Sequence, residues 1–95
     1  MRIKHWQGYG TVNAKKLNCR IVGNKTEITI RVTGNHEYGV RRNDRYDVTR
    51  WLLSRFDKKM TDYRSITSMT LEEGTTDVDG IETDYCDYHI TYRNA

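Results

Sequence analysis

The chain has no proline, only two cysteines in 95 residues, and no apolar run near the roughly 20 residues that a membrane-spanning helix needs. Its opening segment, MRIKHWQGYG, lacks the apolar stretch of a secretory signal peptide. The absence of proline is compatible with a sheet-rich fold. The length leaves no room for separate cofactor and substrate domains. We therefore expect one cytoplasmic domain over residues 1–95.

The two cysteines, Cys19 and Cys86, belong to no Cys-x-x-Cys pair and to no Cys/His spacing typical of zinc sites, so we expect no metal. One disulfide between them is possible, but two free thiols are the interpretation that suits a cytoplasmic protein. The phosphate-binding GxxxxGK loop and the dinucleotide fingerprint are also missing. No cofactor is predicted.

Alternating polar and apolar residues before and after Gly23-Asn24 predict a β-hairpin with those two residues as its turn. Lys16 would then face Arg31, an unfavourable pair of like charges unless an anion lies between them. The predicted pairs are Cys19 with Ile28, Leu17 with Ile30 and Lys15 with Val32 on the apolar face, and Arg20 with Glu27, Asn18 with Thr29 and Lys16 with Arg31 on the polar face.

A second hairpin is predicted around Asp79-Gly80, a turn dipeptide flanked by alternating segments. This register pairs Leu71 with Tyr88 and Met69 with Ile90, so the apolar faces match. It also pairs Glu72 with Asp87. Because these are two like charges, we expect a bulge or a longer loop to loosen the register.

Between the hairpins, apolar residues at Val48, Leu52 and Phe56 predict a helix from about Arg45 to about Lys58. Asn43 or Asp44 would cap its start. Residues 33–43 read as a loop, with a short strand at Tyr38–Val40 as an option. The predicted fold class is α+β: a four-stranded antiparallel sheet of two hairpins with one helix packed on one face, in the order ββαββ.

The net charge of +3 is the difference between two opposite blocks. Residues 1–64 contain 15 Lys and Arg against six Asp and Glu, whereas residues 65–95 contain one against seven. Basic groups interleaved with aromatic rings suit a nucleic-acid strand, through phosphate contacts and base stacking. The candidate basic residues are Lys16, Arg20, Arg31, Arg41 and Arg42, and the candidate aromatic contacts are Trp6, Tyr9 and Tyr38.

The acidic block suits the opposite task, because its carboxylates could occupy a basic groove that normally holds nucleic acid. The candidate residues are Glu72, Glu73, Asp84 and Asp87. The alternative for both blocks is an ordinary solvated surface whose halves attract each other in the fold. The pattern leaves open which end of the chain binds a partner.

Three histidines, His5, His36 and His89, are the candidates for catalysis, since two histidines and a lysine can cleave RNA by acid–base chemistry. Glu37 adjoins His36, but adjacent residues of an extended segment point to opposite faces. Nothing in the sequence brings the three histidines together. We therefore expect a protein that is not an enzyme, with a phosphodiesterase or a nucleotide-sequestering protein as the weaker alternative.

Three segments, GYGTVNAKKL, TEITIRV and DRYDVTRWLLSRFD, resemble the small accessory proteins of phages and mobile elements of Gram-positive bacteria, of the anti-defence (anti-CRISPR-like) type. The resemblance implies an inhibitor that docks on a host defence nucleoprotein or nuclease, such as a Cas effector, in the host cytoplasm. The alternative is a small nucleic-acid-binding module that uses the basic face of the first hairpin. A homo-oligomer is also compatible with the divided charge.

Overall fold

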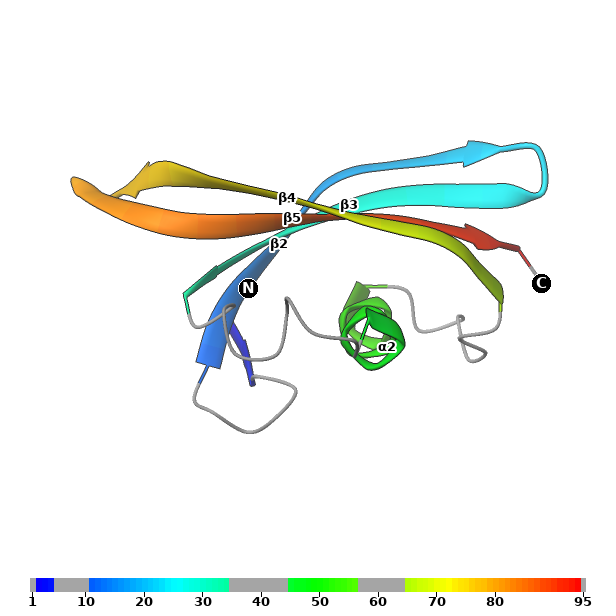
Figure 1. Cartoon of the computed structure of the whole chain (residues 1–95), viewed down its shortest axis with the longest axis horizontal. Helices are drawn as coiled ribbons and strands as arrows, with labels where there is room; N and C mark the ends of the chain where they lie inside the picture. Colours follow the sequence, from blue (N-terminus) through cyan, green and yellow to red (C-terminus); the bar gives the residue numbers. More distant parts are fainter. Residues whose placement is uncertain (1, 5–10, 35–44, 57–64, 95) are drawn as a thin grey trace.

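Five strands and one helix make up the part of the chain that the computed structural model describes, residues 2–4, 11–34, 45–56 and 65–94 (Figure 1). The strands form one antiparallel sheet in the order β1-β2-β3-β5-β4. The elements are β1 (Arg2–Lys4), β2 (Thr11–Val22), β3 (Lys25–Gly34), α2 (Arg45–Phe56), β4 (Ile66–Val78) and β5 (Ile81–Arg93).

The predicted α+β class with an antiparallel sheet and one short helix is confirmed, but the prediction of four strands in the order ββαββ is wrong. A fifth strand, β1, precedes the first hairpin and pairs Ile3 with Val12. It has three residues, of which Ile3 is buried against the core. A strand with one apolar residue between charged neighbours is too short to show an alternating pattern, so this strand could not be predicted from periodicity.

The first hairpin has the predicted turn, in which Gly23 takes a positive φ of 62°. The predicted pairs are confirmed from the turn as far as Asn18 with Thr29. Beyond that point a bulge at Leu17 shifts the register by one residue. The pairs predicted for Leu17, Lys16 and Lys15 are therefore wrong, and the observed pairs are Lys16 with Ile30, Lys15 with Arg31 and Ala14 with Val32.

The bulge has a packing reason. In the unbulged register Lys15 would share the core-facing side of the sheet with Val32, which is buried. The extra residue turns Val12 and Ala14 toward the core instead, where they are 2% and 1% exposed. Lys15 then lies on the opposite, polar side, where it is exposed.

The second hairpin keeps its predicted register from Val78–Ile81 at the turn to Ser68–Thr91. Asp79 and Gly80 both have positive φ, 53° and 81°, as a type I′ turn requires. The expected bulge or longer loop at Glu72 and Asp87 is wrong, because the ladder is regular there and its irregularity lies between Ile66 and Ser68.

The two hairpins meet through β3 and β5, and α2 covers one face of the joined sheet (Figure 1). The predicted helix is confirmed over Arg45–Phe56, and Leu52 and Leu53 are fully buried in the core. The core cluster that they join contains two tyrosines of the sheet, Tyr88 and Tyr92, and several β-branched residues, among them Ile28, Ile30, Val32 and Ile90.

Several predictions lie outside the described residues: the cap at Asn43 or Asp44, the optional strand Tyr38–Val40, and the helix end at Lys58. The side chain of Val48 is likewise not among those described. Within the described ranges, no helix has both the length and the apolar character to cross a membrane.

Tyr88 lies at the centre of the core, and its hydroxyl has no hydrogen-bond partner among the described residues. Burial raises the pKa of this hydroxyl, and the electrostatic effect of the neighbouring Cys86 adds to the rise. We expect Tyr88→Phe to leave the free energy of unfolding unchanged or to increase it by about 1 kcal/mol, because it removes an unpaired buried polar group. Urea denaturation measures this, and a loss of about 1 kcal/mol would contradict the unpaired hydroxyl.

Candidate functional site on the polar face and the hairpin arm

The face of the sheet opposite α2 carries a row of four charged residues, one from each of four adjacent strands. The cross-strand pairs place Lys15 of β2 beside Arg31 of β3, Arg31 beside Asp87 of β5, and Asp87 beside Glu72 of β4. Two positive charges therefore adjoin two negative charges across the sheet. The row crosses the junction between the two hairpins, where Arg31 meets Asp87.

Arg31 and Asp87 form a bidentate ion pair at this junction. Arg31 Nε donates to Asp87 Oδ1 at 2.8 Å and Nη2 donates to Oδ2 at 2.9 Å. The Asp87 side chain is only 8% exposed, against 29% for Arg31. The hydrogen bonds to Asp87 raise the pKa of the Arg31 guanidinium, so this group stays charged.

The Tyr85 ring covers this ion pair, with the Arg31 guanidinium carbon 3.8 Å from the ring centroid. Gly74, the cross-strand partner of Tyr85, makes room for the ring. A Cβ at position 74 would lie 2.5 Å from the Tyr85 hydroxyl oxygen, well inside van der Waals contact. Only glycine at position 74 therefore leaves the Tyr85 ring in its place.

Glu72 has its own partner, His89, whose Nε2 lies 3.1 Å from Glu72 Oε2. The other ring nitrogen of His89, Nδ1, lies 3.0 Å from Thr29 Oγ1. The two carboxylates of the Glu72–Asp87 pair thus turn away to separate partners, His89 and Arg31. This explains why two like charges stand opposite each other without a bulge.

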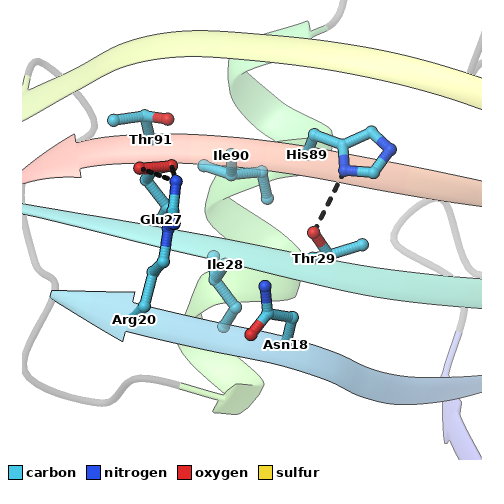
Figure 2. Close-up of a pocket in the computed structure, with 8 residues that line it drawn as sticks. All are labelled: Asn18, Arg20, Glu27, Ile28, Thr29, His89, Ile90 and Thr91. Carbon is cyan, nitrogen blue, oxygen red and sulfur yellow. Dashed lines mark hydrogen bonds and ion pairs between the residues drawn. The ribbon is translucent and has the colours of Figure 1, made fainter. Parts of the chain in front are cut away.

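A depression of about 140 Å³ lies on the same face, beside the exposed Arg20–Glu27 ion pair (Figure 2). Figure 2 shows Arg20 and Glu27 bonded to each other and Thr29 bonded to His89. Four of its polar lining side chains are thus bonded to one another in two pairs. Its lining residues are Asn18, Arg20, Glu27, Ile28, Thr29, His89, Ile90 and Thr91.

The end of the second hairpin projects beyond the sheet (Figure 1). Pairing of β5 with β3 ends at Tyr85, whereas pairing with β4 continues to the turn. We call residues 75–84 the hairpin arm. Among the described strands its backbone pairs only with itself, so no described strand lies along either of its edges.

One face of the hairpin arm is acidic. Asp77 pairs with Glu82, and Asp84 pairs with Thr75, so these carboxylates share the face on which Cys86 points into the core. All three carboxylates are exposed, and within the described residues none forms an ion pair. The opposite face carries the exposed aliphatic pair Val78 and Ile81 beside the turn.

The predicted acidic residues do not form one surface. Glu72 and Asp87 lie on the polar face and are bonded to His89 and Arg31. Glu73 and Asp84 lie on the opposite side of the same hairpin. Asp77 and Glu82, absent from the candidate set, complete the acidic face with Asp84. The predicted Asp79-Gly80 register already paired Asp77 with Glu82, so this signal was available in the sequence.

The predicted basic residues are also divided. Arg31 is bonded to Asp87 and Arg20 to Glu27, so neither guanidinium is free for a phosphate. Lys16 is exposed on β2. The remaining candidates lie outside the described residues: Arg41, Arg42, Trp6, Tyr9, Tyr38, His5 and His36.

Cys19 is exposed, Cys86 is buried, and both are free thiols, so they do not form the disulfide left open above. Among the described residues no three His, Cys, Asp or Glu side chains are arranged to hold a metal ion.

Comparisons with protein-family models, with curated proteins and with solved structures find no match to this chain.

Proposed function

We propose that the chain is a non-enzymatic, phage-type inhibitor of the anti-CRISPR kind, which acts in the host cytoplasm by blocking a nucleic-acid-binding surface of a defence nuclease or nucleoprotein. The observation that carries this proposal is the hairpin arm, with three exposed carboxylates on one face that form no ion pair with any described residue. A surface built to bind phosphates is rich in Lys and Arg, and carboxylates complement it.

The shape of the arm supports the same mode of action. Its two strands stand clear of the sheet and present their carboxylates in two rows, where residues two apart on one strand are about 6.6 Å apart. A narrow, negatively charged ribbon of this kind fits a groove better than a flat surface does.

Charge reversal in the arm tests the proposal. We expect the triple variant D77K/E82K/D84K to inhibit DNA cleavage by a guide-loaded Cas nuclease at least about 100-fold less than the unaltered protein, because the lysines that replace the carboxylates would repel the basic groove. The measurement is a cleavage assay over a panel of purified Cas nucleases from Gram-positive bacteria. Asp87 is left unchanged because it is bonded to Arg31 inside the fold.

The matched control reverses three exposed lysines of the first hairpin, K15E/K16E/K25E. On this proposal the control variant inhibits as the unaltered protein does. Full inhibition by the arm variant, or no inhibition of any nuclease by the unaltered protein, would contradict it. Binding to DNA or RNA that weakens steeply with salt and is lost only in the lysine variant would instead establish the nucleic-acid-binding module.

A further inference from the structure

We infer that Val78 and Ile81, at the tip of the hairpin arm, form an apolar anchor that enters a pocket on a protein partner, and that Lys and Arg side chains rim this pocket. This inference rests on the proposed function and deepens it. It assigns the arm a protein surface as its occupant rather than a nucleic acid.

The first argument is exposure. Val78 is 40% exposed and Ile81 is 69% exposed, and they are cross-strand partners directly beside the turn. A single exposed aliphatic side chain is ordinary on a protein surface. Two aliphatic side chains that are paired at the far end of a projecting ribbon form a small apolar tip. Such a tip can enter a concave surface that the body of the sheet is too broad to enter.

The second argument is rigidity. Asp79 and Gly80 adopt the positive φ values of a type I′ turn, and Asp77 Oδ1 accepts a hydrogen bond from the Gly80 N–H at 2.7 Å. The ladder between β4 and β5 is regular from this turn inward as far as Ser68. The tip is therefore held in one conformation before binding, which reduces the entropy lost when a partner orders it.

The third argument is charge. The pair next to the tip is Asp77–Glu82, and Asp79 stands in the turn itself. These carboxylates repel the phosphates of DNA or RNA, and aliphatic side chains gain nothing from a phosphate backbone. A pocket with an apolar floor and a basic rim satisfies both kinds of side chain at once, as in interfaces with a buried apolar centre and a polar rim.

The first hairpin offers a matched control within the same chain. Its tip also exposes two aliphatic residues, Ile21 at 74% and Val22 at 50%. Beside this tip stand Lys25 and the Arg20–Glu27 ion pair, so the tip offers a basic rim one unpaired positive charge and no acidic side chain that is free of a partner. The two tips are alike in exposure and opposite in charge, which makes the charge the deciding difference.

The test compares V78S/I81S with I21S/V22S, using as the probe the guide-loaded Cas nucleases that the unaltered protein inhibits, immobilised for binding measurements. We expect V78S/I81S to bind about 30-fold more weakly, the ratio that corresponds to the 2 kcal/mol of an interface hot spot. We expect I21S/V22S to bind as the unaltered protein does. Both pairs are exposed, and an unchanged melting temperature establishes that each variant is folded.

The outcomes separate the two proposals. Unchanged binding by V78S/I81S, together with weak binding by D77K/E82K/D84K, overturns the anchor and leaves the proposed function standing. Unchanged binding by both variants, or no binding to any nuclease, overturns the proposed function and the anchor with it. Concentration-dependent self-association that V78S/I81S and I21S/V22S both abolish would overturn the anchor by showing that the occupant is a second copy of the chain.

Discussion

Replacement of Arg31 by alanine is expected to lower the free energy of unfolding by about 3 kcal/mol, which for a domain of this size is about 12–24 °C in melting temperature. The substitution leaves the Asp87 carboxylate, only 8% exposed, without its two hydrogen bonds and opposite Glu72. An unpaired charge in that position costs far more than the ion pair itself contributes. Thermal and urea denaturation measure the loss.

Arg20→Ala is the matched control, because it also removes an arginine bonded to a carboxylate on the same face. The Arg20 side chain is 65% exposed, so its loss is expected to cost at most about 1 kcal/mol. The double variant R31A/D87N is expected to be more stable than R31A, because it removes the Asp87 negative charge together with the Arg31 positive charge that balances it. Equal effects of Arg31→Ala and Arg20→Ala would contradict the role given to the junction.

Leu52→Ala is expected to lower the free energy of unfolding by about 3 kcal/mol. The substitution removes the apolar contacts of a fully buried leucine and leaves a cavity in its place. Leu52 and Leu53 are the fully buried side chains that α2 contributes to the core, as far as its side chains are described. Trp51 and Phe56 of the same helix are partly buried and pack against this core.

The control for this prediction is Arg50→Ala, which changes an exposed position on the same helix and is expected to shift stability by less than about 0.5 kcal/mol. Urea denaturation followed by circular dichroism reports both stability and helix content. A loss below about 1 kcal/mol for Leu52→Ala would indicate that α2 contributes little to the core.

Local features of the sequence predicted most of the fold. Gly23-Asn24 and Asp79-Gly80 each select a two-residue turn, and a turn with alternating flanks sets the register of its hairpin. The bulge at Leu17 was missed although its signal was present. The predicted register places the odd-numbered residues of the first strand on the core side, whereas the apolar residues Val12 and Ala14 have even numbers. One extra residue at Leu17 brings Val12 and Ala14 to the core side.

The candidate site was predictable only within each hairpin. The Asp79-Gly80 register places Gly74 opposite Tyr85, and the structure has this pair. The Arg31–Asp87 ion pair joins residues 56 positions apart on strands of different hairpins. No local pattern states which strands of two hairpins become neighbours, so two candidates expected on separate charged faces could not be recognised as partners.

The junction between β3 and β5 also governs how the chain reaches this fold. Each hairpin closes on nearby residues and can form within about 1–10 μs, whereas the junction must bring together segments some 60 positions apart and is expected to form later. Until then the chain is two tethered ribbons, one predominantly basic and the other predominantly acidic. Their attraction favours the encounter that places Arg31 against Asp87, so we expect added salt to slow folding more than it lowers the stability of the finished sheet.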